Sequence, residues 1–216
     1  MKHRLRISGF LATVVFLVMV VSDLLMLTTL DFSRPYRFWA EAGGLPQAQV
    51  TLGYYLGELT IPFYAVAGWH LALAVRPGGR WAERLILGTT GYAACLFAVW
   101  HASFAFSRSI LRAEAASGST VEADFAFDTY GVPLFRVGLV VAGVGALVFA
   151  GLVASGRSLY PRGALALLLA PTAVVLFALH FHPPLPWSAI LGAARYNVAG
   201  AVLFAVSTAL LWNHDG

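Results

Sequence analysis

Six runs of apolar residues, each long enough to cross a lipid bilayer, account for most of this sequence of 216 residues. They cover residues 8–29, 51–75, 84–107, 131–154, 163–182 and 187–212. The hydrocarbon core of a bilayer is about 30 Å thick and takes about 20 helical residues to cross. Backbone polar groups have no water to bind there, so each run is expected to be an α-helix. The sequence predicts an all-α polytopic membrane protein, a six-transmembrane-helix bundle that forms one integral membrane domain over residues 1–216.

The composition agrees with a membrane protein and argues against a nucleic-acid partner. Hydrophobic residues make up 59% of the chain and charged residues 11%, and the mean hydropathy is +0.77. The net charge of +4 comes from basic residues in short connectors beside the apolar runs, without a soluble basic domain. Membrane lipids are therefore the expected partners. Cys95 is the only cysteine, which excludes a disulfide framework and a cysteine-rich metal site.

The basic residues also predict how the chain lies across the membrane. If the connectors alternate between the two sides, eight basic residues fall on one side and four on the other. Cytoplasmic connectors are enriched in Lys and Arg. The richer side, which carries both termini, is therefore predicted to be cytoplasmic, and the longer connectors 30–50 and 108–130 to be external. The eight residues are Lys2, Arg4, Arg6, Arg76, Arg80, Arg84, Arg157 and Arg162, and the four are Arg34, Arg37, Arg108 and Arg112.

Ionisable or polar residues interrupt the predicted spans at a similar depth, in the outer half. An unpaired charge at that depth costs several kcal/mol, so these side chains are expected to share a protein interior. One interpretation is a structural network in which the two acids neutralise the two arginines. The other, which we favour, is a functional site, because buried ion pairs add little net stability. The residues concerned are Asp23, Glu58, His101, Arg136, His180, His182, Arg195 and Asn197. His70 lies near the inner end instead and is interpreted as an interfacial residue.

The histidines could hold a metal ion or transfer protons. His180 and His182 lie two residues apart in LHFHPPLPW, and both reach one ion only if the helix unwinds before the prolines. With His101, or with Asp23 or Glu58 as a further ligand, they would supply a zinc site with a position for water. A further hypothesis is a haem whose iron is bound by His101 and His180. Without metal, an imidazole oriented by a carboxylate can act as acid and base.

Helix 51–75 carries two signals about its packing and shape. Gly53 and Gly57 in GYYLG form a small-residue face for close helix contact. Pro62 follows Glu58 by four residues and removes the hydrogen bond to the Glu58 carbonyl, which predicts a kink beside the charge. Pro171 has the same effect in the run 163–182.

Two stretches of sequence resemble known membrane proteins. WHASFAF at 100–106 and YNVAGAVLFAVSTALLW at 196–212 resemble the third and last helices of a family of small bacterial six-helix membrane proteins of unknown function, which implies a bacterial cell membrane. The chain is also similar, more loosely, to alkaline ceramidases and adiponectin-receptor-like proteins. That likeness implies hydrolysis at a zinc ion, although those proteins have seven helices and an HxxxH where this chain has HFH.

These observations favour a membrane-embedded hydrolase or lipid-modifying enzyme that acts on a lipid-like substrate. His101, Asp23 and Glu58 are the expected catalytic residues, and His101, His180 and His182 the expected metal ligands. Headgroup binding is expected at Arg136, Arg195 and Asn197. The alternative is a non-enzymatic protein that binds or transports a lipid or small polar solute with the same charged layer.

Overall fold

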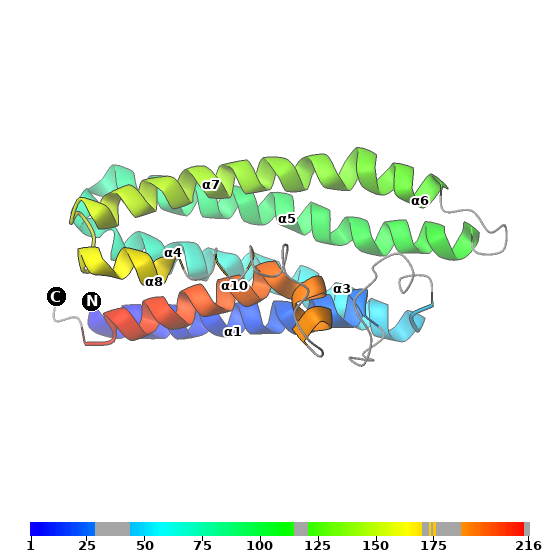
Figure 1. Ribbon diagram of the computed structural model, residues 1–216, viewed down its shortest axis with the longest axis horizontal. Helices are drawn as coiled ribbons and strands as arrows, with labels where there is room; N and C mark the ends of the chain where they lie inside the picture. Colours follow the sequence, from blue (N-terminus) through cyan, green and yellow to red (C-terminus); the bar gives the residue numbers. More distant parts are fainter. Residues whose placement is uncertain (29–43, 115–120, 170–172, 174, 176–186, 214–216) are drawn as a thin grey trace.

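The computed structural model describes residues 1–28, 44–114, 121–169, 173, 175 and 187–213, and these residues are helical with short turns and without strands (Figure 1). The all-α prediction is therefore confirmed for this part of the chain. In chain order the helices are α1 (Lys2–Leu27), α3 (Gln47–Thr60), α4 (Tyr64–Ala74), α5 (Arg80–Glu114), α6 (Val121–Ala126), α7 (Val132–Ala154), α8 (Leu165–Leu168) and α10 (Trp187–Leu211).

Four helical segments among the described residues are long and apolar enough to cross a membrane. They are Lys2–Leu27, Arg80–Glu114, Phe127–Ala154 and Ile190–Leu211. The predicted span 51–75 is instead two shorter helices, α3 and α4, joined by the 3₁₀ turn η1 (Ile61–Phe63). This is the interruption expected at Pro62. Of the predicted span 163–182, the turn η4 (Arg162–Ala164) and α8 are described, and most of the remainder, including Pro171, lies outside the described residues.

The predicted external connector 108–130 is helical in its described parts. Helix α5 has 35 residues, so at about 1.5 Å per residue it is roughly 52 Å long and exceeds the hydrocarbon core. After residues 115–120, which are outside the described part, α6 leads through a π-helical turn, η3 (Phe127–Gly131), into α7.

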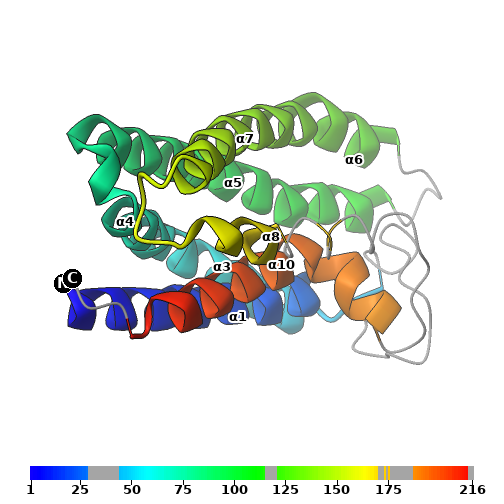
Figure 2. The same cartoon turned by 60° about the vertical axis from the view of Figure 1, so that its left-hand side comes forward.

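The helices pack as long, nearly parallel or antiparallel neighbours. In both cartoon views α1 lies beside α10 and α5 beside α7, with α4 between α1 and α5 (Figures 1 and 2). Both termini lie at the same end of the bundle (Figure 1). Arg6 Nε donates a hydrogen bond of 2.8 Å to the Trp212 carbonyl, and its guanidinium lies over the Trp212 ring. These contacts join the start of α1 to the end of α10.

The connectors that were predicted to share the side of the termini also meet at this end. The Leu159 amide donates to the Ala74 carbonyl at 2.8 Å, and Arg157 Nη2 donates to the Gly78 carbonyl at 3.2 Å. The largest buried apolar cluster lies here too, with Leu5 and Val153 almost fully buried. The relative placement of these connectors therefore agrees with the alternation on which the topology prediction depends.

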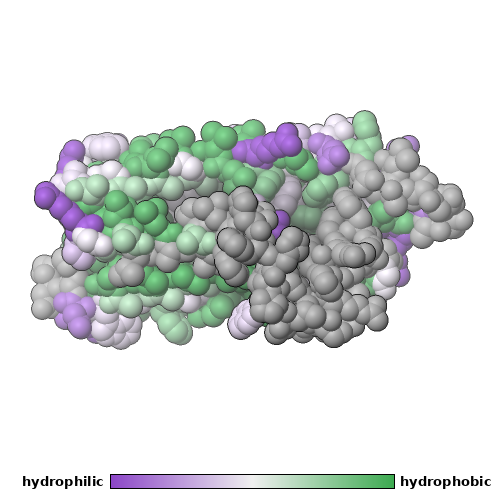
Figure 3. Space-filling model, in the orientation of Figure 1, coloured by the Kyte–Doolittle hydropathy of each residue, from purple (hydrophilic) through white to green (hydrophobic). Residues whose placement is uncertain are grey.

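Large apolar side chains cover the outward faces of the helices. Leu147 is 76% exposed and Leu59 is 70% exposed. Figure 3 shows hydrophobic residues over much of the described part of one face, with hydrophilic residues at its left-hand end and along its upper right. A soluble monomer rarely exposes apolar patches of this extent. The surface fits a protein whose sides face lipid.

Candidate functional site

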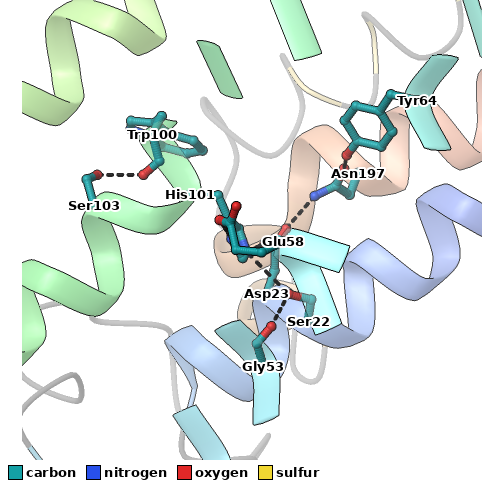
Figure 4. A network of polar contacts seen from close by, with 9 residues as sticks. All are labelled: Ser22, Asp23, Gly53, Glu58, Tyr64, Trp100, His101, Ser103 and Asn197. Carbon is teal, nitrogen blue, oxygen red and sulfur yellow. Dashed lines mark hydrogen bonds and ion pairs between the residues drawn. The ribbon is translucent and has the colours of Figure 1, made fainter. Parts of the chain in front are cut away.

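His101 of α5 lies between two carboxylates that come from two other helices (Figure 4). Its Nδ1 atom is 3.1 Å from Oε1 of Glu58 on α3, and its Nε2 atom is 3.7 Å from Oδ1 of Asp23 on α1. The His101 side chain is 5% exposed, that of Asp23 13% and that of Glu58 24%. The three residues predicted to be catalytic are therefore brought together by the fold, each from a different helix.

Ser22 identifies the nitrogen of His101 that carries a hydrogen. Its Oγ donates to the Gly53 carbonyl at 2.7 Å and lies 3.2 Å from His101 Nε2. A hydroxyl has one hydrogen, which is already donated, so Ser22 accepts from an Nε2–H group. A proton also lies between His101 Nδ1 and Glu58, because two acceptors would not form this contact. Either the His101 ring is an imidazolium beside the Glu58 carboxylate, or a neutral ring accepts a hydrogen bond from the Glu58 carboxylic acid. With Asp23 ionised, both forms give the three residues one net negative charge.

Asp23 is oriented by a short chain of hydrogen bonds. Nδ2 of Asn197 on α10 donates to Asp23 Oδ2 at 2.7 Å, and the Tyr64 hydroxyl on α4 donates to Asn197 Oδ1 at 2.5 Å. Five helices, α1, α3, α4, α5 and α10, thus contribute to one connected network of polar side chains. Asn197, which was expected to bind a ligand headgroup, directly orients a predicted catalytic carboxylate.

Two local irregularities help to bring these side chains together. Pro62 lacks an amide hydrogen, so the Glu58 carbonyl has no helical donor and the chain passes through η1 before α4 begins at Tyr64. In α10, Ala194 has φ −118° and ψ 18°, outside the helical range. Arg195 Nη1 donates to the Gly192 carbonyl beside this break. Tyr64 and Asn197 both follow such an interruption by a few residues.

Gly57 leaves the room that the His101 ring occupies. A Cβ atom at this position would lie 2.1 Å from Cε1 and 2.6 Å from Nε2 of His101, and 2.6 Å from Ser22 Oγ. At Gly53 a Cβ would lie 2.7 Å from Met26 Cγ of α1. The GYYLG motif therefore has the predicted role in close helix contact, and its second glycine also lies directly against the site.

A partly open cavity of about 410 Å³ reaches this network. Most of its wall is apolar and comes from α1, α4, α5, α7, α8 and α10. Its polar lining side chains include Asp23, Tyr64, His101 and Asn197, with the Trp100 ring beside them. Cavities that bind small molecules typically have about 300–1,000 Å³ and a few well-placed polar groups. The size and lining suit a mostly apolar molecule with one polar end.

Glu58 lies on a different surface from Asp23. It lines a more open groove between α3, α5 and the start of α7, together with Ser103, Phe106, Tyr130 and Pro133. Asp23 lines the partly open cavity instead. The His101 ring therefore contacts one carboxylate of the cavity wall and one of the groove wall, because its two nitrogens point in different directions.

The two arginines are not where the sequence interpretation expected them. Arg136 is exposed on α7, and Arg195 donates to the Gly192 carbonyl and lies over the Tyr196 ring. Among the described residues neither forms an ion pair with Asp23 or Glu58. The alternative interpretation, in which the two arginines neutralise the two acids, therefore has no support among the described residues, where both acids lie against His101.

The metal prediction is tested only in part by the described residues. His180 and His182 lie outside them. No group of three His, Cys, Asp or Glu side chains within the described ranges is arranged to hold a metal ion. Both nitrogens of His101 already lie within hydrogen-bond distance of a side-chain oxygen, from Ser22 and Glu58. This ring would have to give up a hydrogen bond to bind a metal.

His70 is fully buried rather than interfacial, which corrects the interpretation from sequence. Its Nδ1 lies 3.0 Å from Ser8 Oγ and its Nε2 lies 2.6 Å from Ser207 Oγ, which in turn is 2.5 Å from the Tyr160 hydroxyl. Hydroxyl groups can donate and accept, so they satisfy a neutral imidazole on both sides. This second network lies near the end of the bundle that carries the termini and holds that end together.

Two residues of the site were missed from the sequence. They are Ser22, which directly precedes Asp23, and Tyr64. Neither carries a motif: Tyr64 is one of 8 tyrosines, and its position just after Pro62 is the single hint. Ser103 donates to the Trp100 carbonyl at 2.5 Å, so this hydroxyl is bonded within its own helix.

Comparison of the chain with family models, with curated proteins and with solved structures finds no match. The resemblances to small bacterial membrane proteins and to alkaline ceramidases stay predictions.

Proposed function

We propose that this chain is a membrane protein that binds a lipid-like molecule, with its apolar part in the cavity and its polar end against Asp23, His101 and Asn197. The observation that carries the proposal is the cavity itself, because an apolar chamber of about 410 Å³ ends at a buried network of ionisable side chains. An amphiphile matches both parts. This develops the lipid-binding alternative that the sequence left open.

The charges of the site favour a particular kind of polar end. With Asp23 ionised, the set of Asp23, Glu58 and His101 carries one net negative charge in both proton arrangements, and neither Arg136 nor Arg195 lines the cavity among the described residues. A hydroxyl or amine can donate to Asp23, whereas a phosphate would meet a like charge. We therefore propose a hydroxyl-bearing or cationic amphiphile. The earlier expectation of arginine-bound anionic headgroups loses its support.

The membrane arrangement proposed for this function has six spans, with both termini in the cytoplasm of a bacterial cell. The helical pair α3 and α4 would form the second span and the run that begins at α8 the fifth. The excess of basic residues at the end that carries the termini supports this orientation. The network of Asp23, Glu58 and His101 then lies in the outer half of the bundle.

A second candidate function, catalysis by a hydrolase or lipid-modifying enzyme, is favoured by one specific observation. Ser22 Oγ, His101 and Glu58 are connected in the order of a nucleophile, a base and an orienting acid, with distances of 3.2 and 3.1 Å. Ser22 is fully buried and donates to Gly53, however, so it is a poor nucleophile as placed. An enzyme at this site would use His101 as acid and base toward water or a substrate hydroxyl.

Native mass spectrometry of the full chain, released from nanodiscs loaded with matched probes, tests the proposal. The probes are octadecanol, octadecylamine and octadecyl phosphate, which share a tail and differ in the polar end. We expect the alcohol or the amine to be retained over the phosphate, and Asp23→Asn to weaken retention of the amine. Asp128→Asn, an exposed acid on η3, is the matched control. Ala142→Phe, which places a phenyl ring in the cavity from its wall, should weaken retention of all three probes.

Equal retention of the three probes, or retention unaffected by Ala142→Phe in a folded protein, would contradict the proposal. To separate binding from catalysis, the mass of the copurified lipid is measured by mass spectrometry before and after incubation with the protein. An altered mass that depends on His101 favours the enzyme, and an unchanged mass favours binding. Elemental analysis of wild type beside His101→Ala and His180→Ala tests the zinc prediction in the same preparations.

A further inference from the structure

The groove that Glu58 lines is separate from the cavity and opens on the flank of the bundle. It has a volume of about 670 Å³ and lies between α3, α5, η3 and the start of α7. Val99, Phe106 and Tyr130 form part of its wall, and each of them is more than half exposed. These side chains belong to the apolar surface that fits lipid. A molecule can therefore enter the groove sideways from the bilayer.

Two side chains of the groove present oxygen atoms that can only accept a hydrogen bond. Glu58 Oε1 contacts His101 Nδ1, and Glu58 Oε2 has no hydrogen-bond partner among the described residues. Oε2 carries no hydrogen whether Glu58 is a carboxylate or donates its proton to Nδ1. Ser103 Oγ has already donated its one hydrogen to the Trp100 carbonyl. A molecule that matches the groove therefore supplies hydrogen-bond donors to both oxygens.

An acceptor without a donor is costly at the place that Glu58 occupies. The Glu58 side chain is partly exposed, and the next residue of α3, Leu59, has one of the most exposed apolar side chains of the protein. In the membrane arrangement proposed above, this surface meets acyl chains, which form no hydrogen bonds. The groove thus combines an apolar wall with a polar atom that lipid tails cannot satisfy.

Charge selects among the possible donors. With Asp23 ionised, the set of Asp23, Glu58 and His101 carries one net negative charge, and no Lys or Arg of the described residues lines the groove. A primary ammonium supplies a positive charge and three N–H donors. A phosphate brings a like charge and further acceptors instead. The exposed Tyr130 ring adds a surface on which a cation can lie.

We propose that this groove is a second lipid site, which binds the primary ammonium of an amine-headed bilayer lipid. Glu58 Oε2 and Ser103 Oγ accept its hydrogen bonds, and its tail lies along Val99 and Phe106 of α5. The site goes beyond the ligand of the cavity, because it lies on another surface and does not depend on which molecule fills the cavity. The π-helical turn η3, which supplies Tyr130 to the wall, agrees with this role, since such turns are frequent at functional sites.

The test counts the octadecylamine molecules that the full chain retains on release from nanodiscs, by native mass spectrometry. We expect two per chain in the wild type and one in Ala142→Phe, in which the cavity is filled and only the groove is free. In this variant, octadecyltrimethylammonium, which has the charge but no N–H donors, should be retained about tenfold less. Glu58→Gln added to Ala142→Phe should weaken amine retention about tenfold, as expected for the loss of one hydrogen bond between charged groups.

A steric variant tests the groove without changing its charges. Ala102→Phe places a ring in the groove from α5 and should weaken amine retention in the Ala142→Phe background as Glu58→Gln does. It keeps the test decisive if Glu58→Gln disturbs the fold, because Ala102 lies outside the polar network. Val140→Phe is the matched control, since this exposed position on α7 lines neither the cavity nor the groove and should leave retention unchanged. Size-exclusion chromatography and the thermal midpoint check the folding of each variant.

Amine retention that Ala102→Phe and Glu58→Gln leave unchanged would overturn the groove site. Equal retention of octadecyltrimethylammonium would overturn the hydrogen-bonded ammonium, because charge and tail would then suffice. Displacement of octadecylamine by ethylamine at the same concentration would show a soluble amine rather than a lipid as the occupant. Failure of the cavity proposal gives a different result, since the wild type and Ala142→Phe would then retain the same number of amine molecules.

Discussion

The Nδ1 atom of His101 lies 3.1 Å from Oε1 of Glu58, although the two residues are 43 positions apart and belong to different helices. The second buried histidine, His70, has serine hydroxyls as its side-chain partners at both ring nitrogens. Hydroxyls satisfy a neutral ring, whereas carboxylates also stabilise a charged one. Of these two buried rings, His101 is the one placed to exchange protons with acids.

Gly57→Ala should destabilise the protein, because the new methyl group would overlap the His101 ring and Ser22 Oγ. Overpacking of this kind costs about 1–3 kcal/mol. Gly91→Ala on α5 is the matched control, since a Cβ there meets nothing within 4 Å. The control should be neutral or stabilising by up to about 1 kcal/mol, because Ala favours a helix over Gly. Equal thermal midpoints for the two variants would refute the close contact at Gly57.

Tyr64→Phe and Asn197→Leu should reveal a coupled chain of hydrogen bonds to Asp23. Tyr64→Phe leaves the Asn197 oxygen without its donor, which costs about 1–3 kcal/mol for a buried polar group. Asn197→Leu should cost more, because Asp23 loses its donor. Reversible unfolding in detergent of both single variants and the double variant measures the coupling. Additive losses would show that the two hydrogen bonds act independently.

The all-α fold and the meeting of four of the polar side chains could be predicted from the sequence, because both depend on local patterns. Apolar length identifies membrane-type helices, and a charge within such a run must face the protein interior. Asp23, Glu58, His101 and Asn197 do meet. Local patterns do not predict which charged side chains pair with one another, because pairing depends on the rotation of each helix about its axis. Arg136 faces outward on α7 for that reason, and nothing in its own span indicates it.

The contributions of Ser22 and Tyr64 could not be predicted, because each depends on a contact between distant segments. Ser22 is placed by the close approach of α1 to α3, and Tyr64 by the 3₁₀ turn at Pro62. The error at His70 has a similar cause. A histidine beside Trp69 near the end of a span resembles an interfacial residue, and its burial depends on α1 and α10, which supply Ser8 and Ser207.

Cysteine labelling should distinguish the two ends of the bundle. In a Cys95→Ser background, Ser155→Cys lies at the exposed end of α7 near the connectors, and Glu122→Cys is exposed on α6 at the opposite end. A membrane-impermeant maleimide added to intact cells should label Glu122→Cys and spare Ser155→Cys until the cells are opened. The reverse pattern would invert the orientation and place the network of Asp23, Glu58 and His101 in the inner half. Labelling of both before opening would contradict a bundle that spans the membrane between them.

Tyr160→Phe should remove a pH dependence of stability that the wild-type protein shows in alkaline solution. Tyr160 lies in the connector after α7, and burial raises the pKa of its phenol well above the ordinary value of 10.0. A group whose pKa is raised on folding contributes stability that is fully present below the unfolded pKa. Above about pH 10 the unfolded chain releases this proton while the folded chain keeps it, so stability falls by up to about 1.4 kcal/mol per pH unit. Tyr160→Phe lacks this loss but gives up the hydrogen bond to Ser207, at a cost of about 1 kcal/mol at neutral pH.

Unfolding of the wild type and Tyr160→Phe, measured in detergent from pH 8 to 11, tests this expectation. The variant should be less stable than the wild type at pH 8, and the difference in stability should shrink as the pH rises. A difference that stays constant across this range would mean that Tyr160 ionises equally easily in the folded and unfolded chains, and that the second network is open to water.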